Sequence, residues 1–103
     1  MTWRLRRTQF AEKDLQDIWS YVAKDSPRAA NKVVRDIVHA FESLSQYPLR
    51  GRAVPEISPD HHIRLSGQYL IIYHLDTLRE VVTLVRVVHG ARDWLALFGD
   101  DEL

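Results

Sequence analysis

The fold is decided by residues Ile63–Asp93, which read IRLSGQYLIIYHLDTLREVVTLVRVVHGARD. This stretch contains two apolar runs, Tyr69–Leu75 and Val81–His89, which are rich in the β-branched and aromatic residues typical of strands. Only the polar turn Asp76–Arg79 separates the runs, so the two strands must pair antiparallel, because a parallel pair needs a long crossover. A further strand at His61–Leu65 completes a predicted three-strand meander.

The alternation of side chains indicates that both faces of this meander are apolar. Successive side chains of a strand point to opposite faces of the sheet. A sheet that is apolar on both faces needs cover on both. The predicted faces are Tyr69, Ile71, Tyr73 and Leu75 against Leu70, Ile72 and His74 in the first long strand, and Val81, Thr83, Val85 and Val87 against Val82, Leu84, Arg86 and Val88 in the second.

The residues before the meander predict a strand followed by a helical hairpin. Trp3–Arg6 alternates apolar and basic side chains, which indicates a short strand. Gln9–Lys24 and Pro27–Gln46 carry apolar residues at helical spacing, and Trp19 is among the positions expected in the core. Ser26 is the expected cap of the second helix. The predicted class is α+β, in the order β-α-α-β-β-β, with the helical hairpin packed on one face of a small, mainly antiparallel sheet.

The remaining segments look too short to cover the second face of the sheet. Tyr47–Pro59 is a proline-rich loop, and Ala91–Gly99 is a short apolar segment expected to form one or two helical turns. We therefore expect apolar sheet surface to be exposed in the isolated chain, as at a protein-binding site. The alternative is that the loop, the C-terminal residues and long side chains cover this face adequately.

Composition limits the classes of function. The 103 residues are expected to form a single domain, residues 1–103. Their formal net charge is zero, so strong direct binding of nucleic acid is not expected. The chain contains no cysteine, which fits a cytoplasmic location, and no apolar stretch long enough to span a membrane. Its five histidines are not spaced as metal ligands, so neither a metal nor another cofactor is predicted.

Four segments between Trp3 and Trp94 follow a recognisable order. They are AEKDLQDIWSYV (Ala11–Val22), YPLRGR (Tyr47–Arg52), GQYLIIY (Gly67–Tyr73) and VRVVHGARD (Val85–Asp93). In this order and at this spacing they resemble the ParE branch of the RelE/ParE toxin superfamily, the toxic halves of bacterial type II toxin–antitoxin pairs. The resemblance covers nearly the whole chain and implies a RelE/ParE-like fold.

The resemblance also implies a function. A ParE-like toxin inhibits DNA gyrase and arrests growth by binding, so no catalytic residue is expected. It is held inactive in a hetero-oligomer with its cognate antitoxin, whose disordered C-terminal segment folds onto the toxin. Such a segment can wrap a large apolar surface, because its ordering entropy is offset by the contacts formed on binding.

A RelE-like toxin, which cleaves messenger RNA on the ribosome, is the first alternative. That chemistry needs groups that move protons and cations that stabilise phosphate charge. In the family resemblance, Leu70 stands where an arginine is usual and Trp94 stands near the place of a tyrosine, while the loop offers Arg50 and Arg52 but no lysine. A different constellation could be formed by Arg64, Arg86, His89 and Arg92. A non-toxic protein-interaction module is the second alternative.

Seven residues are predicted to contact a protein partner, namely Arg64, Tyr69, Tyr73, Arg86, His89, Arg92 and Trp94. Arg86 falls on an otherwise apolar strand face, so it must reach solvent or find an acidic partner, either in an antitoxin or internally at Asp14 or Asp17. His89 and Arg92 flank the exit of the last strand, where they could meet a partner or bond to local groups. The two tyrosines suit packing in a core or an interface, and the tryptophan suits an exposed anchor.

Overall fold

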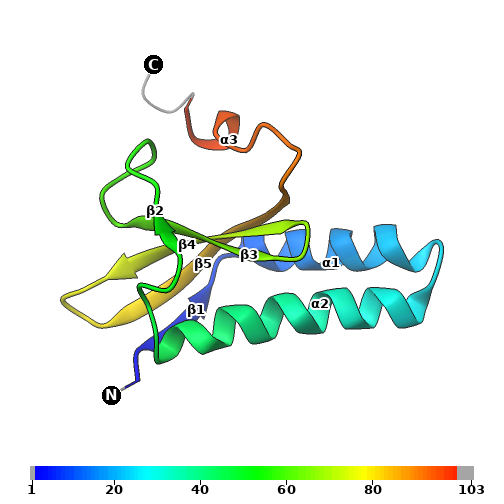
Figure 1. Ribbon diagram of the computed structural model, residues 1–103, viewed down its shortest axis with the longest axis horizontal. Coiled ribbons are helices and arrows are strands. Elements are labelled where there is room, and N and C mark those ends of the chain that lie inside the picture. Colours follow the sequence, from blue (N-terminus) through cyan, green and yellow to red (C-terminus); the bar gives the residue numbers. More distant parts are fainter. Residues whose placement is uncertain (1, 100–103) are drawn as a thin grey trace.

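A computed structural model describes residues 2–99, so the predicted domain of residues 1–103 extends beyond the described residues at both ends. The helices and strands confirm the predicted α+β class and its order, with two short elements added (Figure 1). The elements are β1 (Arg4–Arg7), α1 (Gln9–Ala23), α2 (Pro27–Glu42), the 3-10 turn η1 (Ser43–Ser45), β2 (Arg52–Ala53), β3 (His61–Ser66), β4 (Tyr69–Asp76), β5 (Val81–His89) and α3 (Ala96–Gly99).

The five strands form one sheet in the order β1-β5-β4-β3-β2. β3, β4 and β5 form the predicted antiparallel meander, and β1 lies parallel to β5 at one edge, with Leu5 opposite Val82. β2 is a two-residue strand that pairs antiparallel with β3 at the other edge. Its sequence gives no strand signal, because it lies within the proline-rich loop.

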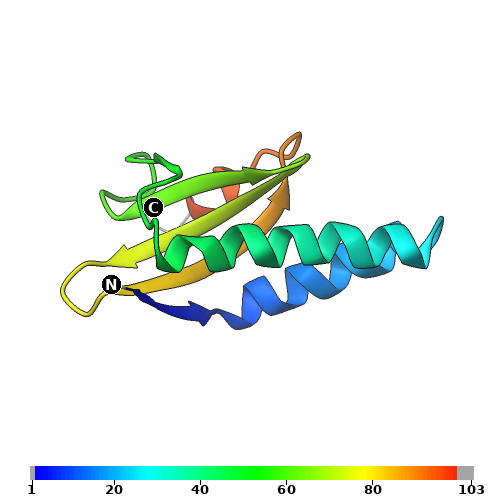
Figure 2. The same ribbon diagram turned by 60° about the horizontal axis from the view of Figure 1, so that its bottom comes forward.

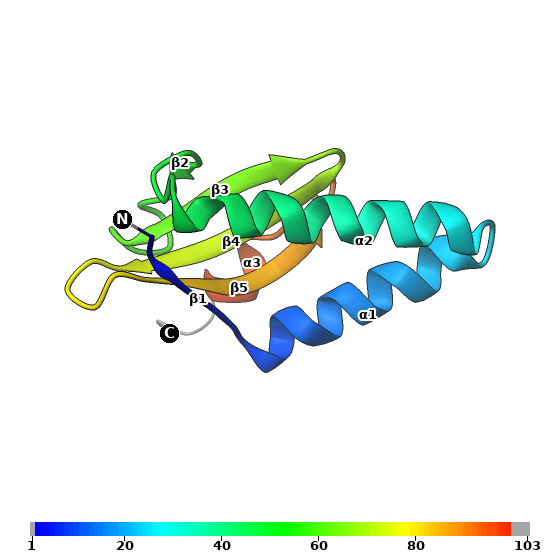
Figure 3. The ribbon, with the colours of Figure 1, turned by 90° about the horizontal axis from the view of Figure 1, so that it is seen from below.

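The helical hairpin covers one face of the sheet, and its tip projects beyond the sheet (Figure 2, Figure 3). Each helix begins at a capping hydroxyl. Thr8 Oγ1 accepts a hydrogen bond from the amide of Ala11 (3.0 Å), and Ser26 Oγ accepts one from the amide of Ala29 (3.1 Å). α2 ends at Glu42, earlier than predicted, and η1 continues it as a tighter turn.

The larger core lies between the hairpin and the sheet. The predicted common face of β4, residues 69, 71, 73 and 75, packs into it. The placement of Trp19 in the core is wrong: its side chain is 39% exposed, and its indole N–H donates to Asn31 Oδ1 (2.8 Å). α1 instead turns Ala11, Leu15 and Ile18 to the sheet. The largest side chains fully buried in this core are Ile37, Phe41, Leu44, Ile71, Tyr73, Val82 and Leu84.

A β-bulge breaks the alternation predicted for β5. Residues 72 and 73 of β4 lie opposite residues 86 and 84 of β5, so Val85 has no partner residue on β4. The extra residue shifts the phase of the strand. Val87 therefore packs in the larger core together with Val82 and Leu84, and its predicted place on the opposite face is wrong.

Asp14 of α1 fastens the helix to this bulge. Arg86 Nε and Nη2 donate to Asp14 Oδ2 (2.7 Å) and Oδ1 (2.9 Å), and the amide of Val87 donates to Asp14 Oδ2 (2.9 Å). Thr8 Oγ1 donates to the carbonyl oxygen of the bulged residue Val85 (2.7 Å). The hydrogen bonds that Arg86 donates to the Asp14 carboxylate hold the pKa of Arg86 above its ordinary value. Of the partners considered for Arg86, the structure selects Asp14.

The second face of the sheet is covered more fully than predicted, so the expected exposure of a broad apolar sheet surface is wrong. Leu70 and Ile72 of β4 face away from the hairpin, yet they are only 8% and 0% exposed. The loop after η1 covers them with Val54 and Ile57, and the segment around α3 adds Phe98. α3 lies on the side of the sheet opposite the hairpin (Figure 1). Local patterns do not reveal this cover, because it arises when a loop folds back through β2.

One histidine lies beneath this C-terminal cover. The ring centroid of His61 lies 5.1 Å from that of His74 and 6.1 Å from that of Phe98. Partial burial, followed by the nearby His74, lowers the pKa of His61 below its ordinary value of 6.5. The folded protein therefore favours the neutral form of this ring.

Removing the Asp14 carboxylate is expected to destabilise the protein. Asp14→Ala leaves the partly buried Arg86 guanidinium and the Val87 amide without their acceptor, at a cost of about 2–4 kcal/mol. The matched control is Asp17→Ala on the same helix, because the exposed ion pair of Asp17 with Lys13 is worth at most about 0.5 kcal/mol. Urea unfolding measures both variants, and equal losses would contradict the anchoring role of Asp14.

The lowered pKa of His61 predicts a stability that falls with acidification. As the pH drops below about 6.5, the unfolded chain binds a proton at this position before the folded chain does, so the free energy of unfolding decreases until the folded pKa is passed. His61→Gln is expected to make this decrease shallower. Urea midpoints measured across this pH range test the prediction, and parallel profiles for the two proteins would refute it.

Candidate functional site

A groove of about 240 Å³ runs between α1 and the neighbouring ends of β4 and β5. We call it the α1–β5 groove. The residues that line it include Asp17, Ile18 and Tyr21 of α1, Tyr69 of β4, His89 at the end of β5 and Arg92 just beyond it. Three of the predicted contact residues, Tyr69, His89 and Arg92, are thus brought together on one surface.

His89 is held by its neighbours in the sheet. Its Nδ1 accepts a hydrogen bond from the amide of Ala91 (3.1 Å), so in the neutral ring the proton lies on Nε2, which is 3.1 Å from Gln68 Oε1. The ring also meets the edge of Tyr69, with centroids 5.5 Å apart and planes at 79°. These contacts fix the orientation of His89 while leaving the residue exposed on the rim of the groove.

Arg92 and Tyr21 give the groove its accessible charge and its accessible apolar surface. Within residues 2–99 the Arg92 side chain forms no ion pair, so the alternative in which Arg92 bonds to a local acidic group is not seen there. Tyr21 is 70% exposed, and the Lys24 ammonium lies 5.8 Å from the centre of its ring. The groove therefore offers a guanidinium and an aromatic ring side by side to a partner.

Two of the predicted contact residues have internal roles. Arg86 is engaged by Asp14, as described above. Tyr73 is fully buried, and its hydroxyl donates to the carbonyl oxygen of Pro48 (2.9 Å) and accepts from the amide of Gly51 (3.0 Å). Burial raises the pKa of Tyr73 above its ordinary value. This tyrosine ties the loop to the sheet and presents no surface to a partner.

The close approach of this loop to β3 explains why residue 51 is a glycine. A Cβ at Gly51 would collide with the carbonyl oxygen of Ile63 and with the hydroxyl of Tyr73. Only a glycine lets the backbone approach β3 this closely. Trp94, predicted as an exposed anchor, is half-buried and packs against the second-face core.

Arg64 lies apart from the α1–β5 groove, in a second pocket of about 350 Å³. We call it the basic pocket, after its three arginines, Arg50, Arg52 and Arg64. Arg64 Nη1 donates to Ser43 Oγ (3.0 Å), and burial, followed by the nearby charge of Arg50, lowers the pKa of Arg64. The buried Leu70 also lines this pocket, so an apolar side chain stands at the position where the family resemblance has an arginine.

Among residues 2–99, no three His, Asp or Glu side chains are placed to hold a metal ion. No helix in the same part of the chain is both long and apolar enough to cross a membrane.

Sequence reasoning missed the aromatic residues exposed on α1. Phe10 and Tyr21 are 69% and 70% exposed. They lie outside the apolar stripe of the helix, and large aromatic residues on the polar side of an amphipathic helix are a usable signal for a binding surface. The Arg86 guanidinium lies 5.8 Å from the centre of the Phe10 ring, so the Asp14 network supports this surface from beneath.

Comparison with known proteins gives a consistent result at the level of sequence. The family model described as "ParE toxin of type II toxin-antitoxin system, parDE" matches residues 5–94. The chain is 33% identical over 91 residues to the putative toxin Y4kP of Sinorhizobium fredii, and 32% identical over 91 residues to Toxin RelE2 of Caulobacter vibrioides. Each alignment covers 88% of this chain and 92% of the relative.

Solved structures share the fold. A chain from the chromosomal ParDE system of P. aeruginosa superposes with a TM-score of 0.71 at 23% identity, covering 85% of this chain and 96% of that one. A chain from the RelBE2 toxin–antitoxin complex of Mycobacterium tuberculosis gives 0.62 at 29% identity, covering 86% and 99%. A mutant of the E. coli toxin RelE in the free state gives 0.70 at 14% identity, covering 100% and 99%.

Proposed function

This chain belongs to the ParE toxin family of type II toxin–antitoxin systems, and we propose that it arrests growth by binding DNA gyrase and is neutralised by a cognate antitoxin. The observation that carries the choice of gyrase is the match of residues 5–94 to the family of parDE toxins. A cytoplasmic location is part of the same proposal, because gyrase and a disordered antitoxin segment both act there.

The side chains at the end of the sheet support a mechanism of binding. Arg86, the strand arginine available for phosphate chemistry, is committed to the Asp14 carboxylate. His89 accepts at Nδ1 from a backbone amide, which takes that nitrogen out of proton transfer to a substrate. Leu70 is 8% exposed within the second-face core. These groups serve the fold, and the exposed groups around them suit recognition.

The α1–β5 groove is the proposed seat of the antitoxin segment. It is lined by the exposed ring of Tyr21 and by the guanidinium of Arg92, which forms no ion pair within residues 2–99, so it offers an apolar surface with a charged rim. An amphipathic segment that folds on binding can bury Tyr21 and place a carboxylate against Arg92. The RelBE2 structure of M. tuberculosis is itself a toxin–antitoxin complex, which supports a partner of this kind.

Ribosome-dependent cleavage of messenger RNA is the second candidate function. The basic pocket favours it, because Arg50, Arg52 and Arg64 gather three guanidinium groups that could stabilise phosphate charge. The 32% identity to Toxin RelE2 points in the same direction. The two functions differ in target and in the surface used, so they can be separated by experiment.

Replacing Tyr21 is expected to weaken binding of the antitoxin. Tyr21→Ala removes an exposed ring that a partner would bury, which should cost about 1–3 kcal/mol of binding free energy, or roughly fivefold to 150-fold in Kd. Tyr47→Ala is the matched control, because Tyr47 is 55% exposed but lies in the loop away from the groove. Titration calorimetry with the purified antitoxin measures both variants. Equal affinities for the two would place the antitoxin elsewhere.

The choice of target is tested by a supercoiling assay with purified gyrase. The chain is expected to inhibit supercoiling and to accumulate cleaved DNA, and addition of the antitoxin should reverse both effects. Arg50→Ala combined with Arg64→Ala is expected to leave this inhibition intact, because the basic pocket is not used. The second candidate would be established instead by two results together. The wild-type protein would cleave ribosome-bound message and leave supercoiling unaffected, and the double variant would lose that cleavage.

A further inference from the structure

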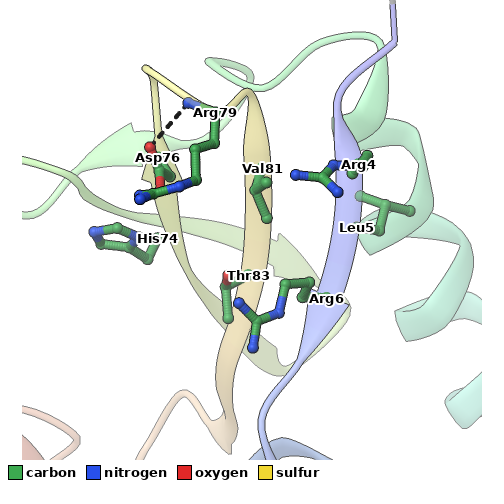
Figure 4. A pocket seen from close by; sticks show the side chains of 8 residues that line it. All are labelled: Arg4, Leu5, Arg6, His74, Asp76, Arg79, Val81 and Thr83. Atoms are coloured by element: carbon green, nitrogen blue, oxygen red, sulfur yellow. Dashed lines mark hydrogen bonds and ion pairs between the residues drawn. The ribbon is translucent and has the colours of Figure 1, made fainter.

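A third pocket, of about 610 Å³, lies on the face of the sheet away from the hairpin, beyond the cover given by α3 and the loop. It extends along β1 and β5 to the β4–β5 turn (Figure 4). We call it the β1-edge pocket. Its polar lining consists of Arg4 and Arg6 of β1, His74 and Asp76 of β4, Arg79 of the turn and Thr83 of β5.

The charges in this pocket are unbalanced. Arg79 is paired with Asp76 (3.1 Å), whereas Arg4 and Arg6 form no ion pair with any residue between 2 and 99. In Figure 4 the side chains of Arg4 and Arg6 extend from β1 towards β5, beyond which His74 and Arg79 lie. Guanidinium groups bind carboxylates through paired, charge-assisted hydrogen bonds. The pocket therefore selects an acidic partner.

The backbone beside the pocket is also available. β1 is the end strand of the sheet and pairs only with β5 within the described residues. The amides of Arg4 and Thr8 donate to carbonyl oxygens of Glu80 (2.9 Å) and Leu84 (3.0 Å). In a parallel ladder the alternate residues then direct their N–H and C=O groups outward. An open edge of this kind is a template for another strand.

We propose that the open edge of β1 binds an extended acidic polypeptide segment as an added strand, whose carboxylates enter the β1-edge pocket. Arg4 and Arg6 lie two residues apart and so share one face of the sheet. An added strand places every second side chain on that face, next to these arginines. The matching segment therefore carries Asp or Glu at alternate positions. A second copy of the basic strand β1 is disfavoured as the occupant, because like charges would face each other.

The probe is a fluorescein-labelled peptide of about eight residues, the length of a long strand, in which Thr and Glu alternate. Its matched isomer has the same composition with the Glu residues in adjacent pairs. Fluorescence anisotropy with the full chain is expected to show binding of the alternating peptide at least about fivefold tighter than binding of the isomer, with affinity falling as salt rises. Methylation of every second amide nitrogen of the peptide should abolish binding in one of the two frames only, since just one edge of an added strand faces β1.

Two charge-reversed protein variants distinguish binding at the β1-edge pocket from a general effect of net charge. Arg4→Glu with Arg6→Glu is expected to weaken binding of the alternating peptide by tenfold or more, on the order of what two lost charge-assisted pairs cost. Arg28→Glu with Arg35→Glu changes the net charge equally on exposed positions of α2 and should have little effect. Urea unfolding confirms that all four substitutions leave the fold intact.

Three outcomes would overturn the proposal. The first is equal binding of the two peptide isomers, which would reduce the effect to bulk charge. The second is undiminished binding by the Arg4/Arg6 double variant. The third is tighter binding of a thymidine oligonucleotide of matched charge through the same arginines, which would make the β1-edge pocket a nucleic-acid site. Because no arm of the experiment involves gyrase or the antitoxin, its result is independent of the proposed function.

Discussion

One carboxylate, that of Asp14, sets the position of the helical hairpin on the sheet. It accepts hydrogen bonds from the Arg86 guanidinium and from the Val87 amide, so it binds both a side chain and the backbone of β5. The bulge at Val85 adds to this anchorage, because it leaves the carbonyl oxygen of Val85 free to accept a hydrogen bond from Thr8. Asp14 also lines the α1–β5 groove, so the same contact holds the two walls of that groove together.

Much of the fold was predictable because its signals are local. The caps at Thr8 and Ser26, the helical stripes and the common face of β4 all depend on near neighbours in the chain. The bulge in β5 was not predictable, since Val85 is apolar and both faces of the sheet are apolar, so its side chain suits either face. The cover of the second face was missed for a related reason: Val54 and Ile57 sit in a proline-rich loop, and only the long-range pairing of β2 with β3 brings them over the sheet.

The candidate site was predictable only in part. Tyr69, His89 and Arg92 meet because antiparallel pairing places the start of β4 beside the end of β5, which the meander already implied. Arg64, Tyr73 and Trp94 lie outside the α1–β5 groove, and their positions depend on tertiary packing that spacing does not encode. The arginines of this electrically neutral chain are instead sorted by partner: Arg86 is neutralised by Asp14, whereas the groups around Arg64 and around Arg4 retain net positive charge. The zero net charge of the chain therefore conceals local positive patches, and such patches are the features that suit the surface for recognition.

The parallel pairing of β1 with β5 also governs how the protein comes into being. A ribosome releases β1 first, and its partner strand emerges only after nearly eighty more residues have been added, because Arg4 lies beside Val81. Pairings between such distant segments form late. Until β5 has emerged, the nascent chain therefore lacks a finished sheet, and the α1–β5 groove cannot form because the end of β5 lines it.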